Sequence, residues 1–326
     1  MSRLFRRRPL AGLAALAGLG LLAAGCSGGG GSAAPGGLEK TNLTVEAVPA
    51  LDSAGLYIAQ QRGLFAAEGL NVTILPAVSG ATAIAGQLQG QVDITAGNYV
   101  SYIEANTTAK DPADFRVLAP GSIMQADNQD IVVPQHSGIA TVSDLANKTI
   151  GVNVKNNIGT LLISSILSDN SVTVNSRQFV PIQFPDMGQA LADHKVDAAW
   201  LPQPYVTEDE EQYGVQPLAD ANQGSTQDLP IEGYMVTESW LKKYPNTAAA
   251  FRKALLKAQA IAVSDPGAVQ QGMAKFAKTP MQSAAIAGAP EFPTTQSASV
   301  LQRVANLMLN FGMLQQHYDV TPMVVK

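Results

Sequence analysis

The chain has 326 residues, of which 46% are hydrophobic and 14% are charged, and its formal net charge at pH 7 is −5. These values are typical of a folded globular protein that is long enough for a large core and two domains. The acidic balance argues against a nucleic acid partner. Cys26 is the only cysteine, which excludes a disulfide framework and a thiolate metal site.

The first 25 residues have the pattern of a secretory signal peptide. Four basic residues stand near the start, namely Arg3, Arg6, Arg7 and Arg8. The apolar run that follows, residues 10–24, is shorter than a membrane-spanning helix and rich in Gly and Ala. The segment Ala23-Ala24-Gly25-Cys26 resembles a bacterial lipobox, so we expect lipidation of Cys26; the alternative is that Cys26 is merely a small residue of the signal peptide. The consecutive arginines leave twin-arginine export open.

The segment after the signal peptide is predicted to be a tether. Residues 26–40 are dominated by Gly, Ser and Ala, a composition that forms a flexible coil and cannot bury a core. We therefore expect a signal peptide at 1–25, a lipid-anchored tether at 26–40 and a globular body beyond it, exported to the outer face of the cytoplasmic membrane. Removal of the signal peptide deletes four arginines and no acidic residue, so the remaining protein is more acidic than the whole chain.

Beyond the tether, short apolar strands alternate with amphipathic helices. The predicted strands in the first part of the body are 43–48, 71–78, 92–96, 116–119 and 130–133. The predicted helices are 54–68, ended by Gly69, then 81–89 and 98–107. Helices of this length between strands favour mainly parallel sheets with helices on both faces.

The same alternation restarts further along the chain. Strands are predicted at 149–154, 179–183 and 197–201, with helices at 158–167 and 186–194 and an acidic helical turn at 208–211. After 233–237 the chain is predicted to be helical, chiefly over 245–263 and 294–311. Two α/β units in series indicate two lobes, with crossovers predicted at Pro134–Gly138 and Leu229–Gly233.

Several segments, taken in order, resemble one family of transporter receptors. The longest is AGLYIAQQRGLFAAEGL at residues 54–70, which is similar to a signature of that family's first lobe. The other matching segments are 88–94, 143–152, 190–200 and 238–245. The family comprises the nitrate, sulfonate and taurine-type solute-binding proteins of ABC importers, and it includes receptors for the pyrimidine precursor of thiamine.

This resemblance implies a two-lobed, periplasmic-binding-protein-like α/β fold of type II, with a ligand cleft between mainly parallel sheets. Lobe 1 would comprise residues 41–134 and 233–326, and lobe 2 residues 135–232. The implied partners are a small-molecule solute and the permease and ATPase subunits of an ABC importer, and no cofactor is implied. The solute would be a small nitrogen- or sulfur-containing compound of the aminopyrimidine, sulfonate or amine class.

Candidate binding residues follow the predicted strands, because ligands of open parallel sheets bind beyond the carboxyl ends of the strands. Helices that begin there also direct free backbone N–H groups into the cleft. The expected contacts are Asp52, Ser53, Ser79, Gly80, Asn98, Tyr99, Asn156, Asn157, Gly159, Thr160, Trp200 and Gln203. Asp52, Ser79 and Asn98 are alternatively helix N-caps, and Trp200 is alternatively core packing. Tyr57, inside a predicted helix, is expected in the core.

Asp52 bears on the chemistry of the solute. A buried carboxylate in the cleft repels a simple anion and pairs instead with an amine, amidine or aminopyrimidine. No arginine falls in the predicted cleft loops, and Lys155 is the only cation there. The sequence therefore favours an uncharged or amine-bearing solute with an aromatic or apolar body over nitrate, and Asp52→Asn is predicted to weaken its binding.

The sequence contains no recognisable catalytic constellation. Its three histidines, His136, His194 and His317, are far apart, and no metal-ligand spacing links them. It also has no P-loop, nucleophile elbow or dinucleotide fingerprint. Two alternatives to a receptor are a cell-surface lipoprotein without a transport role and a cytosolic pyrimidine synthase of thiamine biosynthesis that shares the fold. That synthase has a cysteine-rich segment, which this chain lacks, so we expect a receptor and not an enzyme.

Overall fold

The structure is a computed structural model that describes residues 37–107, 114–173 and 175–325. The predicted signal peptide, Cys26 and most of the predicted tether lie outside the described residues. Within this described part of the chain, no helix combines the length and the apolar character that a membrane crossing requires. The described residues belong to one compact unit, which contains two β-sheets.

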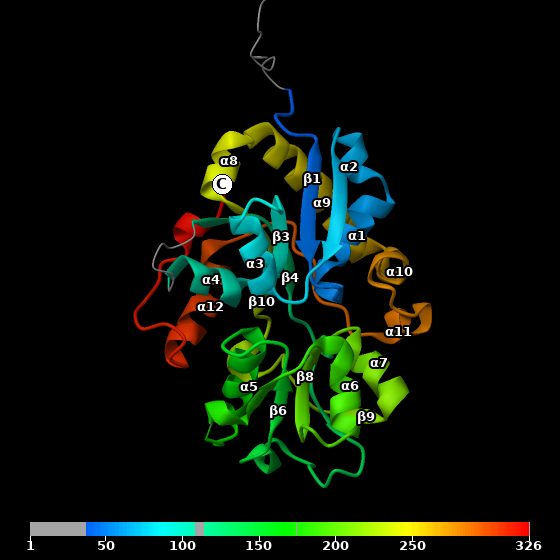
Figure 1. The fold of residues 1–326 in the computed structure, drawn as a ribbon, viewed down its shortest axis with the longest axis vertical. Helices are drawn as coiled ribbons and strands as arrows, with labels where there is room; N and C mark the ends of the chain where they lie inside the picture. Colours follow the sequence, from blue (N-terminus) through cyan, green and yellow to red (C-terminus); the bar gives the residue numbers. More distant parts are fainter. Residues whose placement is uncertain (1–36, 108–113, 174, 326) are drawn as a thin grey trace, which may run out of the picture. The chain divides into compact units, whose positions relative to one another are not determined.

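The first sheet has five strands, four of which run in the same direction (Figure 1). Its strands are β1 (Asn42–Ala47), β2 (Asn71–Pro76), β3 (Ile94–Asn98), β4 (Phe115–Ile123) and β10 (Pro230–Thr237). They are ordered β2-β1-β3-β10-β4, and β10 is antiparallel to both of its neighbours. The apolar residues Leu43, Val45 and Ala47 of β1 alternate with less buried residues, so one face of the strand packs in the core.

The second sheet repeats this plan. Its strands are β5 (Gln129–Pro134), β6 (Ile150–Val152), β7 (Phe179–Pro181), β8 (Ala198–Pro202) and β9 (Val215–Asp220). They are ordered β7-β6-β8-β5-β9, and β5 runs in the opposite direction to the other four strands. The central strand β8 is buried along its whole length, as expected for a strand covered by helices on both faces. The predicted fold class, α/β with mainly parallel sheets in two lobes, is confirmed.

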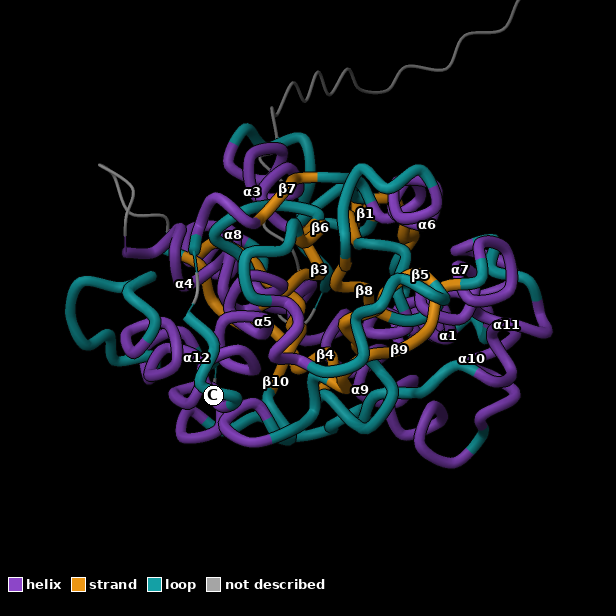
Figure 2. Tube along the Cα trace, turned by 90° about the horizontal axis from the view of Figure 1, so that it is seen from below, coloured by secondary structure: helices purple, strands orange, loops and turns teal. Residues whose placement is uncertain are grey.

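Helices cover both sheets, and in the view from below they surround the strands (Figure 2). Those of the first sheet include α1 (Ala54–Gln61), α2 (Leu64–Ala67), α3 (Gly80–Leu88) and α4 (Tyr99–Thr107). The prediction of a single helix over 54–68 is wrong, because Gly63 adopts a left-handed conformation with φ of 66° and separates α1 from α2. Tyr57 is buried in the core, as expected.

The second sheet carries α5 (Ile158–Asp169), α6 (Phe184–Ala192) and α7 (Tyr205–Tyr213). The acidic turn predicted at 208–211 is the middle of α7, which ends at the left-handed Gly214. Strand β9, which follows, was not predicted, because its sequence VQPLAD alternates only weakly and contains a proline. A proline is tolerated there because β9 lies at the edge of the sheet.

The last part of the chain returns to the first sheet. It forms α8 (Glu238–Lys243), α9 (Pro245–Ser264), α10 (Pro266–Gly272), α11 (Met281–Ile286) and α12 (Ala298–Asn310). Helix α9 packs against α1 and α2, where the rings of Phe251 and Phe65 stack with centroids 4.9 Å apart. Helix α12 contacts α4, so these C-terminal helices complete the layer around the first sheet.

The chain crosses between the sheets at residues 124–128 and returns at 221–229. The first crossover was therefore predicted one strand too late, at Pro134–Gly138, because β5 pairs with β8 and β9 in the second sheet. The second was predicted at Leu229–Gly233, but Pro230 already begins β10 in the first sheet. An apolar strand carries no local mark of the sheet that it joins, so these boundaries depend on tertiary pairing.

Candidate ligand-binding site

The candidate site is a cavity of about 40 Å³ between the two sheets, and most of the residues that line it are buried. Strands β1, β3, β6 and β8 bring their carboxyl ends to it, whereas the antiparallel strands β5 and β10 bring their amino ends. The lining residues are Val48, Ala50, Asp52, Gly80, Gly97, Asn98, Gln129, Asn153, Ile158, Phe184, Trp200, Pro202, Ile231 and Glu232. Both lobes therefore contribute polar and apolar groups to one cavity.

Asp52 lies at the end of the loop after β1, in a short 3₁₀ turn, and only 3% of it is exposed. The hydroxyl of Ser122 on β4 donates a hydrogen bond to its Oδ1 at 2.7 Å. Burial raises the pKa of Asp52 to about 6, although hydrogen bonds from Ser122 and Gln129 oppose that rise. Asp52 is thus a largely desolvated carboxyl that the protein itself only partly satisfies.

Glu232 is the second buried carboxyl of the cavity, and only 4% of it is exposed. It stands near the start of β10, and the hydroxyl of Ser53 donates to its Oε1 at 2.7 Å. Burial raises its pKa to about 8, and the nearby negative charge of Asp52 contributes to the rise. The two carboxyls therefore form an interacting pair at the floor of the first lobe, and none of the described residues that line the cavity is Lys, Arg or His.

The second lobe faces this pair with polar groups that have no partner among the described residues. These atoms are Oε1 of Gln129, Oδ1 of Asn153 and the indole Nε1 of Trp200. All three residues are buried and line the cavity. A buried polar atom without a hydrogen bond costs stability, so such a concentration points to groups kept for a ligand.

An aromatic cluster forms the wall of the second lobe. The ring of Phe184 lies 5.5 Å from that of Trp200 and 5.2 Å from that of Tyr205, between centroids. Helix α5 begins beside Trp200, and Gly159 permits the close approach, because a Cβ there would lie 2.4 Å from Cε3 of the indole. The orientation of Trp200 in the cavity wall is thus fixed by packing.

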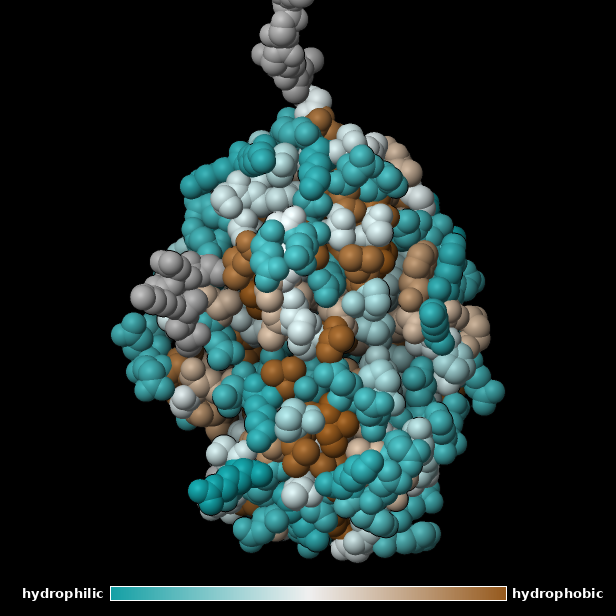
Figure 3. Space-filling view, viewed as in Figure 1, coloured by the Kyte–Doolittle hydropathy of each residue, from teal (hydrophilic) through white to brown (hydrophobic). Residues whose placement is uncertain are grey.

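Direct contacts join the lobes around the cavity. The backbone N–H of Leu51 donates to the carbonyl oxygen of Gln203 at 2.9 Å, and Nδ2 of Asn157 donates to Oγ of Ser101 at 2.8 Å. On the face shown in Figure 3, hydrophobic surface occurs at the level between the two sheets and is flanked by hydrophilic surface. The two lobes are therefore in direct contact beside the cavity, which limits its volume.

The predicted contacts fall into three groups. Asp52, Gly80, Asn98 and Trp200 line the cavity. Ser53, Asn157, Gly159 and Gln203 lie one contact away, where they hold Glu232, position Trp200 or join the lobes. The remaining four, which the structure does not bring to the cavity lining, are Ser79, Tyr99, Asn156 and Thr160.

These four residues have other surroundings. Ser79 caps α3 by accepting a hydrogen bond from the Thr82 N–H at 3.3 Å. Asn156 and Thr160 line a separate cavity of about 400 Å³ that also includes Lys155. Tyr99 is buried at the back of the first lobe.

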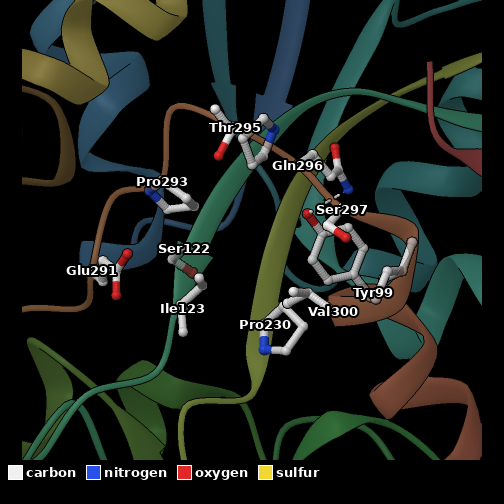
Figure 4. Close-up of a pocket in the computed structure, with 12 residues that line it drawn as sticks. Tyr99, Ser122, Ile123, Pro230, Glu291, Pro293, Thr295, Gln296, Ser297 and Val300 are labelled. Carbon is white, nitrogen blue, oxygen red and sulfur yellow. Dashed lines mark hydrogen bonds between the residues drawn. The ribbon is translucent and has the colours of Figure 1, made fainter. Parts of the chain in front are cut away.

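Tyr99 borders a cavity of about 200 Å³ behind the binding cavity (Figure 4). Ser122 lines this second cavity and also donates a hydrogen bond to Asp52, which lines the binding cavity. Figure 4 shows Glu291, Pro293 and Gln296 on a segment that passes across β4 and β10, and this segment forms a bridge between Glu291 and Ile123. Ser122, which donates to Asp52, thus lies on a strand that this segment covers.

Sequence reasoning missed Glu232, Gln129 and Asn153. Glu232 and Gln129 lie near the amino ends of antiparallel strands. The rule used on the sequence selects only residues that follow the carboxyl ends of parallel strands, so it did not select these two. Glu232 nevertheless gave one signal, since it is the only charged residue in the otherwise apolar segment PIEGYMVT. Among the residues that the structure describes, no group of three or more His, Cys, Asp or Glu side chains could hold a metal ion.

This architecture, two α/β lobes around an enclosed cavity, is that of the periplasmic binding proteins. Two solved structures match it closely. The alkanesulfonate-binding protein SsuA from Xanthomonas axonopodis pv. citri, bound to MOPS, has a TM-score of 0.73 and 17% identity, over 89% of this chain and 99% of that one. The periplasmic nitrate-binding protein NrtA from Synechocystis PCC 6803 has a TM-score of 0.73 and 14% identity, over 86% of this chain and 84% of that one.

The chain belongs to the NMT1/THI5-like family, whose sequence profile matches residues 50–269. A relative in sequence is YtlA, a candidate binding protein of Bacillus subtilis (strain 168), which is 26% identical over 210 residues. The match covers 63% of this chain and 61% of that protein. The resemblance to nitrate and sulfonate receptors inferred from the sequence is thus confirmed.

The same fold also occurs in an enzyme. The desulfurization enzyme DSZB has a TM-score of 0.66 and 17% identity, over 88% of this chain and 96% of that one. The similar proteins are mostly binding proteins, yet the fold by itself does not separate a receptor from an enzyme. That distinction depends on the chemistry of the cavity.

Proposed function

We propose that this protein is an extracytoplasmic receptor that captures a small nitrogen- or sulfur-containing organic solute for an ABC importer. The observation that carries the proposal is the convergence of buried groups from both sheets on one cavity. Asp52 and Glu232 come from the first lobe, and Gln129, Asn153 and Trp200 come from the second. A ligand that touches both sets stabilises the closed arrangement of the lobes.

Closure would couple capture to transport. The contacts from Leu51 to Gln203 and from Asn157 to Ser101 exist only while the lobes are together, so they add to the stability of the closed state. A bound solute shifts the population toward the closed state by the ratio of its affinities for the closed and open states. The closed lobes then present a surface that the permease of the importer recognises.

The remaining parts of this proposal concern location and partners. The basic start, the apolar run and Cys26 support export and lipid anchoring at the outer face of the cytoplasmic membrane. The Gly/Ser tether would let the receptor reach its permease while it remains anchored. The expected macromolecular partners are the permease and the ATPase subunits of an ABC importer.

A binding role fits the cavity better than an enzymatic one. The hydroxyls of Ser53 and Ser122 each donate to a buried carboxyl group, so both are engaged in holding the carboxyl pair. The cavity instead offers preorganised hydrogen-bonding atoms beside a flat aromatic wall.

Purified mature protein tests the proposal in two ways. Native mass spectrometry of protein exposed to a metabolite extract should reveal one retained small molecule, and small-angle scattering should show a more compact protein with that molecule than without it. Replacement of the cavity wall by Trp200→Ala should abolish retention. A retained compound that is converted to another during incubation would contradict the receptor role and favour an enzyme.

A further inference from the structure

Acceptors outnumber donors among the buried side-chain atoms at the cavity that have no partner within the described chain. Glu232 receives one serine hydroxyl, and Asp52 receives the Ser122 hydroxyl together with hydrogen bonds from Gln129 and its own backbone N–H, whereas a carboxylate accepts about four hydrogen bonds. Oε1 of Gln129 and Oδ1 of Asn153 add two further free acceptors from the opposite lobe. Among the described lining residues, the indole N–H of Trp200 is a buried donor without a partner. A ligand that satisfies this set must itself be rich in N–H donors.

The charge of the cavity points the same way. Its two carboxyl groups lie close enough to interact electrostatically. Among the described residues that line the cavity, none is Lys, Arg or His. Neither carboxyl takes part in an ion pair within the described chain, and both are almost completely buried. A buried carboxyl pair needs a counter-charge in order to ionise fully, and none of the described lining residues supplies one.

The aromatic wall suits the same kind of ligand. Trp200 and Phe184 pack at 5.5 Å, with Tyr205 behind Phe184. An aromatic face attracts a cation most strongly when water is excluded, and an indole does so best. A planar amidinium or guanidinium group could stack on this wall while its edge donates to the carboxylates.

Resting on the receptor function proposed above, we propose that the solute is a small organic cation of the amine, amidine or guanidine class. Its N–H groups donate to Asp52 and Glu232 from the first lobe and to Gln129 and Asn153 from the second. Its apolar or planar body lies on Trp200. The ligand neutralises the carboxyl pair and bridges the lobes in one step, so recognition and closure depend on the same charge.

The proposal excludes the anions named for the similar structures. A sulfonate or nitrate in this cavity would lie beside two buried carboxyls, and no Lys, Arg or His among the described lining residues would balance its charge. Like charges within a buried site repel each other strongly, because the low dielectric amplifies their interaction. This chain would therefore use the fold of an anion receptor with the opposite electrostatic sign.

Isothermal titration calorimetry with pairs of nearly equal shape tests the charge directly. The pairs are guanidinium with urea, acetamidinium with acetamide, and ethylammonium with ethanesulfonate, all at millimolar concentration or below. At least one cation should bind, and its neutral or anionic counterpart should bind at least 100-fold more weakly. Equal binding of the two members of each pair, or binding of ethanesulfonate alone, would overturn the proposal.

Two substitutions that preserve shape test the residues. Asp52→Asn and Glu232→Gln should each weaken cation binding by at least 50-fold, whereas the surface control Glu68→Gln, which affects an ion pair with Lys253, should leave it unchanged. Circular dichroism spectra and urea unfolding establish that each variant is folded. Unchanged cation affinity in both folded cavity variants would refute the assignment.

The outcomes also separate this inference from the receptor function. Ethanesulfonate binding with lobe closure in small-angle scattering would leave the receptor role intact and overturn the cation. Failure of every cation on the panel, with retention of a neutral metabolite from the extract, would have the same meaning. Turnover of a bound cation would instead support the ligand class and contradict the receptor role.

Discussion

The substitution Glu232→Gln should stabilise the ligand-free protein at neutral pH, even though it removes a group proposed to bind the solute. Glu232 is buried next to Asp52 and receives one hydrogen bond, from Ser53. Its pKa is raised from 4.5 to about 8, chiefly by burial. Between these two values the folded protein retains a proton that the unfolded chain releases, so the stability of the wild type falls as the pH rises through this window.

The size of the effect follows from the same shift. Each pH unit above 4.5 lowers the free energy of unfolding by about 1.4 kcal/mol until the folded group itself ionises, which gives roughly 3 kcal/mol at pH 7. Glutamine keeps the shape and still accepts from Ser53, but it cannot ionise. The variant should therefore be about 3 kcal/mol more stable at pH 7, and equal to the wild type within error at pH 4. At about 2.1 cal/mol/K of melting entropy per residue, the melting temperature rises by about 5 °C at pH 7.

Urea unfolding followed by circular dichroism at pH 4, 5, 6, 7 and 8 measures this pH profile. Glu68→Gln is the matched control, since it makes the same chemical change on the surface of the first lobe and should give a small difference that hardly varies with pH. A Glu232→Gln variant that is less stable than the wild type at pH 7, or equally stabilised at every pH, would refute the reasoning. Either result would mean that Glu232 is ionised and compensated within the folded protein.

Three further predictions concern ligand binding and closure. Gly159→Ala places a Cβ 2.4 Å from the Trp200 ring, so it should lower the free energy of unfolding by about 1–3 kcal/mol and weaken ligand binding at least 10-fold. The control is Gly86→Ala, whose Cβ would lie 3.5 Å from its nearest neighbour and should cause neither effect. Urea unfolding measures the stability and calorimetry the binding. Ser101→Ala removes the acceptor of Asn157 across the lobes and should reduce affinity about 5-fold, with less closure in small-angle scattering; an unchanged affinity would contradict a role for this contact. Cation affinity should rise from pH 6 to pH 8, because the cation requires ionised carboxyls and the pKa values of Asp52 and Glu232 are raised to about 6 and about 8. Calorimetry in buffers of different ionisation enthalpy should detect the protons that are released on binding. An affinity that falls over this range would exclude the carboxyl pair as the binding group.

Local features of the sequence were sufficient for most of the fold. The alternation in β1, the helical spacing in α5 and the stop at Gly69 each depend on neighbouring residues, and their boundaries agree with the structure to within a few residues. Asp52 could be proposed because it follows a parallel strand, and Trp200 because it lies close to the carboxyl end of one. Local chemistry and a general rule of sheet geometry therefore determined half of the cavity.

The other half was decided by tertiary pairing alone. Strand β10 inserts between β3 and β4 in the antiparallel direction, which brings Glu232 beside Asp52 and within 2.7 Å of Ser53, 179 positions away in sequence. Strand β5 likewise joins the second sheet and brings Gln129 to the opposite wall. Neither the partner of a strand nor its direction is encoded in a short apolar segment, because the same alternation fits any sheet edge. The sequence thus determined that one carboxylate faces the cleft, and only the tertiary structure made it a pair.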